Sequence, residues 1–365
     1  MHKKYKIIKF PEDESVHDYI IEWWYFNGHL KADNGNEYSF MNCLFKADIE
    51  KVKIPFLSKI PLKNSYFSHS LLSDLKNKNF NHRTTPLSLL SEDSFSKDLL
   101  YINYINPTVI NNYTNCVIEK IDESIYHLKN EDIDLKLTSI KKPLMEGGKG
   151  FLDLHSKKTY YYSLTNLKTE GRIKIKNKWI NVTGKSWMDH QWADVGYSKN
   201  RWDWFSIQLD DNTDMICCMY DDGNIKTNFA DISYADGKQE HYKDIEITPL
   251  EKKWTSPKSK AVYPVSWKIK IPAKNIELNL IAKIEAQEML FGSINYWEGP
   301  TKVEGIFGDK KVSGNGFMEL VGYKSEYTNV KYLTEEIKKT ASYFASIAKN
   351  KAIDISENLK KKIIE

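Results

Sequence analysis

From about Ile21 to Tyr323, apolar and polar residues alternate in short runs that turn residues separate. Period-two alternation is typical of antiparallel strands, because successive side chains of a strand point to opposite faces. The predicted strands are residues 22–30, 37–47, 158–164, 202–209, 214–220, 263–271 and 276–284. Asn-Gly or Asp-Gly turns at residues 33–36, 221–224 and 235–238 tolerate the positive φ of tight hairpins. The pattern therefore predicts an all-β fold.

The chain of 365 residues is expected to form two cores, because single cores tend to divide beyond roughly 250 to 300 residues. Each half has room for about eight strands, which fits an antiparallel barrel that closes its own edges and holds one small ligand. We place the first barrel at residues 1–185 and the second at residues 186–325. Residues 49–63 and 77–98 interrupt the first half, and we predict loops or short helices there that cap a barrel mouth.

After Tyr323 the apolar spacing changes to three and four, which predicts a long amphipathic helix over residues 326–365. Residues 330–365 hold eight Lys against five acidic residues, so they carry +3 of the net +4 of the chain. The rest of the chain is electrically balanced and lacks the basic surface that nucleic-acid binding requires. We expect the helix to pack across the body or a partner, with a peripheral membrane contact as the alternative.

Several site classes are not indicated. The four cysteines form no CxxC pair and are interpreted as reduced packing residues. The nine histidines are scattered and no zinc or nucleotide motif is present, so we expect no metal site and no cofactor. No apolar run follows the basic N-terminus, which predicts a cytoplasmic protein, membrane-associated only if the helix binds lipid.

Aromatic residues make up 13% of the chain, and they gather around acids. The densest cluster runs from Gly184 to Trp192 and continues at Arg201–Phe205. In a strand, Trp187, Asp189 and Gln191 would share one face, and Met188, His190 and Trp192 the other. Similar mixtures occur at residues 22–25, 220–222 and 296–299. A carboxylate buried among indoles is costly unless it is paired or protonated, so these segments are candidate sites. The alternative is that the aromatics fill barrels and the carboxylates face solvent at strand ends.

At these residues the sequence resembles the CrtC/AttH family, which includes carotenoid 1,2-hydratase and is related to fungal lipocalin-like Diels-Alderases. The resemblance spans residues 20–324 in order. It rests on Glu22–Tyr25 with Gly28 and Leu30, Phe67–Ser70 with Asp74, Gly184–Trp192 with Trp202–Phe205, Tyr296–Gly299, and Gly314–Leu320 with Gly322 and Tyr323. It implies two tandem lipocalin-like barrels.

The resemblance also implies a function, a cofactor-free hydratase acting on a hydrophobic isoprenoid or polyene. A His-x-Trp motif matches residues 190–192 and a Tyr-x-Asp motif matches residues 220–222. The implied catalytic residues are Asp189, His190, Trp192, Tyr220 and Asp222. The expected substrate-binding residues are Glu22, Trp23, Tyr25, His69, Trp187, Gln191, Trp204, Tyr296, Trp297 and Glu298. Two alternatives stay open: a non-catalytic carrier of a hydrophobic small molecule, and a pericyclase in natural-product biosynthesis.

Overall fold

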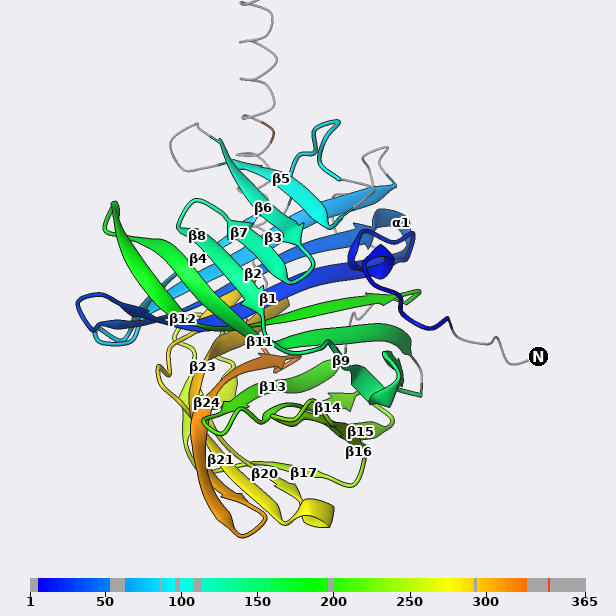
Figure 1. Ribbon diagram of the computed structural model, residues 1–365, viewed down its shortest axis with the longest axis vertical. Coiled ribbons are helices and arrows are strands. Elements are labelled where there is room, and N and C mark those ends of the chain that lie inside the picture. The colour runs from blue at the N-terminus through cyan, green and yellow to red at the C-terminus, as the bar shows by residue number, and fades with distance from the viewer. Residues whose placement is uncertain are drawn as a thin grey trace, which may run out of the picture.

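The computed structural model describes residues 6–52, 63–85, 87–95, 99–107, 113–155, 157–195, 200–291, 294–326 and 341. Over these residues the chain is almost entirely β, and it forms two large curled antiparallel sheets, one above the other in Figure 1. The predicted all-β class is therefore confirmed. The predicted C-terminal helix over residues 326–365 lies outside the described residues, which there include only Glu326 and Ala341.

The first sheet is built from the N-terminal half, in the order β4-β3-β2-β1-β12-β11-β8-β7-β6-β5, with β9 and β10 paired to β11. Asn106 on β5 donates a hydrogen bond of 2.7 Å from Nδ2 to Ser68 Oγ on β3, so the sheet curls until its two ends approach. Its strands are β1 (Ile21–Ala32), β2 (Glu37–Asp48), β3 (Asn64–Asp74), β4 (Asn79–Thr85), β5 (Tyr101–Pro107), β6 (Tyr113–Asp122), β7 (Ile125–Lys129), β8 (Ile133–Ser139), β9 (Leu144–Met145), β10 (Phe151–Asp153), β11 (Lys158–Ile175) and β12 (Lys178–Ala193).

The second sheet has the order β16-β15-β14-β13-β24-β23-β21-β20-β17, with β22 paired to β23. Only residues 243–245 join its two end strands, β16 and β17, so this sheet also curls back on itself. Its strands are β13 (Arg201–Leu209), β14 (Asp214–Asp221), β15 (Lys226–Ser233), β16 (Gln239–Tyr242), β17 (Glu246–Pro249), β20 (Ser266–Ile271), β21 (Ile276–Ala282), β22 (Glu288–Phe291), β23 (Ile294–Phe307) and β24 (Lys310–Val321). A separate hairpin pairs β18 (Lys253–Thr255) with β19 (Val262–Pro264).

Helical structure in the described part of the chain is short. It comprises α1 (Ile49–Val52) and the 3-10 turns η1 (Glu12–Glu14), η3 (Glu146–Gly148) and η4 (Pro272–Lys274). None of these helices has the length and apolar character needed to cross a lipid bilayer. The prediction of loops or helices over residues 77–98 is wrong in part, because β4 extends the first sheet there and pairs with β3 along its whole length.

The expected domain boundary between residues 185 and 186 falls inside β12. That strand pairs with β1 and β11 up to Ala193, so the change from the first sheet to the second comes later, between Ala193 and Arg201. Strand β12 is continuous through residues 185 and 186, so the alternating pattern marks no break at that point. The assignment of each half to a separate domain stays a prediction.

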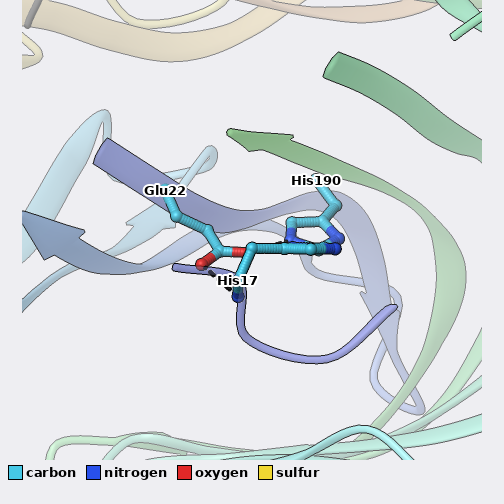
Figure 2. A group of neighbouring side chains, drawn as sticks. All are labelled: His17, Glu22 and His190. Atoms are coloured by element: carbon cyan, nitrogen blue, oxygen red, sulfur yellow. Dashed lines mark hydrogen bonds and ion pairs between the residues drawn. The ribbon is translucent and has the colours of Figure 1, made fainter. Parts of the chain in front are cut away.

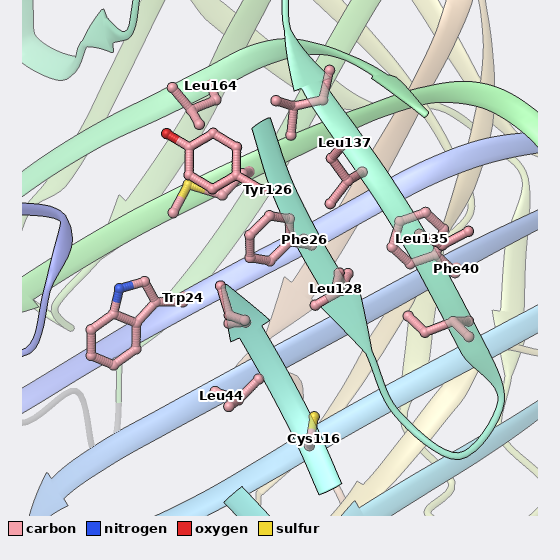
Figure 3. Close-up of a cluster of buried hydrophobic side chains, with 14 of the residues drawn as sticks. Trp24, Phe26, Phe40, Leu44, Cys116, Tyr126, Leu128, Leu135, Leu137 and Leu164 are labelled. Carbon is pink, nitrogen blue, oxygen red and sulfur yellow. The ribbon is translucent and has the colours of Figure 1, made fainter. Parts of the chain in front are cut away.

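Three apolar clusters follow from strand alternation. One fills the first sheet (Figure 3), and another fills the second. The third lies between the two sheets and draws side chains from both. On β1, Trp24 and Phe26 point into the first cluster, and Tyr25 between them points into the third. The four cysteines are free and buried, as predicted.

Candidate active site

Strand β12 separates the candidate residues of the aromatic-rich segment into two groups. Met188 and Trp192 belong to the cluster inside the first sheet, and Trp187 belongs to the cluster between the sheets. The predicted division of faces is thus confirmed. Asp189 lies with Trp187, to which it is hydrogen bonded, and His190 stacks on Trp24 inside the first sheet. Asp189 and His190 are adjacent in sequence, but they cannot act on the same reacting atom.

Asp189 is buried between the sheets and is held by three donors. Tyr161 O–H donates to its Oδ2, and the Ser163 hydroxyl and the Trp187 indole N–H donate to its Oδ1, each at 2.6 Å. Burial raises the pKa of Asp189 to about 7, although the three hydrogen bonds oppose the shift. Trp204 on β13 donates to Tyr161 O–H at 3.0 Å and so links the second sheet to this acid.

Ser163 connects Asp189 to a second buried acid. Its Oγ lies 2.6 Å from Asp189 Oδ1 and 2.8 Å from Glu146 Oε1. One hydroxyl proton can serve only one of these oxygens, so the other contact requires a protonated carboxyl group. Burial and the charge of Asp231 raise the pKa of Glu146 well above its usual range, which identifies Glu146 as that group.

A carboxyl pair lies on neighbouring strands of the second sheet. Glu298 and Glu319 are directly opposite in the β23–β24 ladder, and their side chains are within hydrogen-bonding reach of each other. Tyr25 O–H donates to Glu298 Oε1 at 2.8 Å, and Trp202 Nε1 donates to Glu319 Oε1 at 2.5 Å. Burial and the charge of Glu319 raise the pKa of Glu298 well above its usual range, and burial also raises the pKa of Glu319. The two carboxyl groups can meet only if one of them keeps a proton.

Aromatic rings surround this pair. Tyr25 and Trp204 meet edge to face with centroids 5.3 Å apart, and Trp187 meets Trp204 at 6.4 Å. His69 Nδ1 lies 2.6 Å from Tyr296 O–H, and burial lowers the pKa of His69 to about 3, so its imidazole is neutral. The site thus combines protonated acids with apolar ring faces, which suits proton transfer to a hydrophobic molecule.

Three phenylalanines extend the aromatic layer toward solvent. Phe67 on β3 stacks on Phe45 of β2 at 4.7 Å and on Phe291 of β22 at 5.8 Å, so both sheets contribute to the stack. All three rings are partly exposed. His69 packs against each of the three rings and also contacts Tyr296, so it links the phenylalanines to the inter-sheet cluster.

A separate polar group lies inside the first sheet, formed by His17, Glu22 and His190 (Figure 2). Glu22 Oε1 lies 2.6 Å from His17 Nδ1 and 2.9 Å from His190 Nε2. Trp192 stacks on His17 with centroids 4.0 Å apart, and Trp24 stacks on His190 at 4.7 Å. Glu22, His190 and Trp192 therefore form one group, away from the carboxyl pair.

Comparison with known proteins agrees with this architecture. A family model described as AttH-like matches residues 2–323. The chain belongs to the AttH-like family. The resemblance inferred from the motifs is thereby confirmed.

Solved structures share the AttH-like fold. The AttH protein of Nitrosomonas europaea superposes with a TM-score of 0.69 at 23% identity, covering 87% of this chain and 98% of that one. Kievitone hydratase from Nectria haematococca gives 0.67 at 19% identity, covering 86% and 93%. CghA gives 0.52 at 12% identity, covering 84% and 89%. A curated relative, dehydratase asqC of Emericella nidulans, is 23% identical over 206 residues, and the match spans 53% of this chain and 58% of that protein.

Two of the expected site residues, Trp297 and Asp222, point away from the carboxyl pair. Trp297 alternates with its neighbours on β23 and points into the second core, where its indole donates to the Glu285 carbonyl at 2.6 Å. Asp222 Oδ1 accepts the backbone N–H groups of Asn224 and Ile225, both at 2.9 Å, and so shapes a turn. Tyr220 is buried in the inter-sheet cluster and Trp23 packs against that cluster. Gln191 donates to Thr159 Oγ1 at 3.0 Å.

Sequence reasoning missed several members of the site. Glu146, Tyr161, Ser163 and Asp231 lie in segments without Trp, so the search for acids among indoles did not find them. His17 lies in the segment before β1 and belongs to no recurring motif. Tyr161 and Ser163 could have been found by alternation, because they share a face of the predicted strand at residues 158–164.

Proposed function

We propose that this AttH-like protein is a hydro-lyase that adds water to, or removes it from, an apolar alkene bound between the two sheets. The observation that carries the proposal is the carboxyl pair of buried Glu298 and partly buried Glu319, which lie directly opposite each other beside aromatic rings, each with a raised pKa. The names of two relatives, a hydratase and a dehydratase, are consistent with this reaction type. By family analogy we propose a long isoprenoid or polyene as substrate.

The carboxyl pair acts first as the acid and then as the base. Protonated Glu298 transfers its proton to one alkene carbon, and the adjacent carbon becomes a cation. A water molecule adds its oxygen to that cation and loses a proton to the pair, which is then restored to its initial state. The atoms balance without an oxidant, a reductant or a second substrate. A desolvated acid suits this step because proton transfer to an alkene needs a strong donor.

Aromatic faces stabilise the charge that develops in this step. An indole or phenol ring attracts a cation by about 2 kcal/mol or more when water is excluded, and it does not trap the cation covalently. Trp204 and Tyr25 lie against each other beside Glu298, and Trp187 contacts Trp204. In this scheme Asp189 is a positioning residue, because it fixes Tyr161 and through it the indole of Trp204.

The layer of Phe45, Phe67 and Phe291 supports an apolar substrate. These rings are stacked nearly parallel, with interplanar angles of 7° and 10°, and they present partly exposed faces next to His69. A flat, conjugated or branched hydrocarbon chain matches parallel ring faces better than a charged molecule does. We assign this layer to the end of the substrate that does not react.

The test is incubation of the purified protein in water enriched in oxygen-18 with apolar alkenes, including lycopene, neurosporene and prenylated phenols, and with the corresponding tertiary alcohols. We expect uptake or loss of one labelled hydroxyl group. Glu298→Gln should reduce turnover by roughly 10²- to 10⁴-fold, the usual contribution of a general acid. Glu288→Gln is the matched control, because Glu288 is also buried on the second sheet but is held by hydroxyl groups.

Three outcomes would contradict the proposal. Full activity of Glu298→Gln would exclude the carboxyl pair as the acid. A rearranged carbon skeleton without the label would indicate a pericyclase. Ligand retention without turnover, unchanged in the variant, would indicate a carrier.

A further inference from the structure

Three potential ligands converge inside the first sheet. His17 comes from the segment between η1 and β1, Glu22 from the start of β1 and His190 from β12. Each residue offers one potential ligand atom, and these three atoms lie within 4.8 Å of one another. Figure 2 shows the two imidazole rings directed at the same carboxylate from different segments of the chain.

The hydrogen bonds of His17 do not balance for a neutral ring. Its Nδ1 lies 2.6 Å from Glu22 Oε1, and its Nε2 lies 3.2 Å from Asp13 Oδ1. Both contacts require a donor on the ring, because an ionised carboxylate only accepts. A neutral imidazole has one N–H, so in that form His17 can donate to only one of the two carboxylates.

We infer that His17, Glu22 and His190 bind one divalent transition-metal ion, through His17 Nδ1, a Glu22 carboxylate oxygen and His190 Nε2. A metal ion between these three residues would remove the need for two N–H donors on His17. His17 Nδ1 gives its lone pair to the metal, and Nε2–H donates to Asp13. Likewise His190 coordinates through Nε2, and its Nδ1–H donates to Tyr162 O–H, 3.3 Å away.

The contacts of the two histidines beyond the inferred metal position are typical of a metal site. Metal-bound histidines usually donate their second N–H to a carboxylate, a carbonyl or another oxygen, which fixes the tautomer and the ring direction. Asp13 serves His17 in this way, and Tyr162 serves His190. The stacked indoles of Trp192 and Trp24 hold the two rings in place.

The donor set indicates the class of metal. Two imidazoles and one carboxylate suit zinc and its neighbours, whereas magnesium and calcium prefer oxygen ligands. Bonds of about 2.0–2.2 Å in a tetrahedron would set the ligands about 3.3 Å apart. The contacts of 2.6 and 2.9 Å to Glu22 would therefore have to open, and the two imidazole nitrogens, which lie within 4.8 Å of each other, would have to settle at the same spacing. Three protein ligands leave a fourth position for water. Lys46 Nζ lies 4.0 Å from Glu22 Oε2, whereas both imidazoles contact the other oxygen, Oε1.

The inferred metal site is independent of the proposed hydro-lyase site. Glu22 and His190 face the interior of the first sheet, whereas the acids of the active site lie between the sheets. Access is available through His17, whose side chain is 15% exposed. The metal would fasten the segment that carries Asp13 and His17 to β1 and β12.

The test is titration of the full chain, stripped with a chelator, with cobalt(II) and then zinc(II). We expect one equivalent of cobalt with the visible absorption of a four-coordinate ion, displaced by zinc, and a higher melting temperature with metal. Asp13→Asn should weaken binding by roughly 10- to 100-fold, and His17→Ala by more. The control is His127→Ala, because His127, like His17, is a partly exposed histidine paired with a carboxylate, in this case Asp134.

Two results would overturn the inference. One is no stoichiometric binding of cobalt or zinc by the folded wild-type chain. The other is equal affinity of wild type and His17→Ala, with circular dichroism showing that the variant is folded. Glu298→Gln should bind metal as wild type does, so a failed hydro-lyase assay and a failed metal titration are separate outcomes.

Discussion

The shared proton of Glu298 and Glu319 has a measurable effect on stability, which Glu298→Gln isolates. Glutamine has the shape of the protonated acid. Its carbonyl can keep the hydrogen bond from Tyr25, now 2.8 Å long, and its amide can donate to Glu319. The variant therefore fills the same space and satisfies its neighbour without binding a proton.

The sign and size of the effect follow from linkage. The folded chain holds Glu298 at a pKa well above the ordinary 4.5, because of burial and the charge of Glu319. As the pH rises above 4.5, the unfolded chain releases this proton and the folded chain retains it, so wild type loses stability. One retained proton corresponds to about 1.4 kcal/mol per pH unit. Glu298→Gln lacks this loss, so its stability relative to wild type should rise with pH above 4.5, by at most about 1.4 kcal/mol for each pH unit over which the folded chain keeps the proton.

The assay is urea unfolding followed by tryptophan fluorescence at pH 5, 6 and 7, on wild type, Glu298→Gln and the control Glu288→Gln. The difference between Glu298→Gln and wild type should grow steadily with pH. The control removes an acceptor from Ser256, Ser259 and Tyr263, and it measures the cost of losing a buried carboxylate elsewhere on the same sheet. A difference between Glu298→Gln and wild type that is the same at all three pH values would refute the shared proton.

Three further predictions concern packing and buried polar groups. Tyr161→Phe removes a donor to Asp189 and should cost roughly 1–3 kcal/mol in urea unfolding; an unchanged midpoint would contradict the hydrogen bond. Gly28→Ala places a Cβ 2.5 Å from a ring carbon of Phe40, so its melting point should fall by the equivalent of about 1–3 kcal/mol, and a rise would show that the strands can separate there. Burial holds the pKa of His69 at about 3, so as the pH falls below 6.5 the unfolded chain gains a proton that the folded chain does not. Wild type should therefore lose stability by about 1.4 kcal/mol per pH unit, and His69→Gln should not. Parallel stability profiles of the two proteins against pH would argue against a neutral His69.

Much of the fold could be predicted, because each strand carries its own alternating pattern. The hairpins at Gly35, Gly223 and Gly237 were predicted from their dipeptides, and all three glycines have positive φ. The changeover between the sheets was not predictable in this way. Alternation reports that a strand has two faces, and it does not report which sheet the strand joins.

The candidate site was predicted only in part, for a physical reason. Local geometry alone decides which residues share a face of β12. The separation of Asp189 from His190 could therefore be predicted from the sequence. The meeting of Tyr25 with Glu298 depends on how two sheets pack, and these residues are 273 positions apart. No local pattern carries that information. The family resemblance placed both Asp189 and His190 among the catalytic residues, and the fold holds them on opposite sides of β12.

The two faces of strand β12 carry different chemistry, and both are encoded by the nine residues from Gly184 to Trp192. A deletion or insertion of one residue near its start would turn every later side chain to the opposite side. Asp189 would then enter the histidine group, and His190 would enter the acid cluster. Single substitutions, in contrast, can alter one side and leave the other intact. The strand therefore allows the two sites to evolve separately by substitution, and it makes both of them vulnerable to a single shift in length.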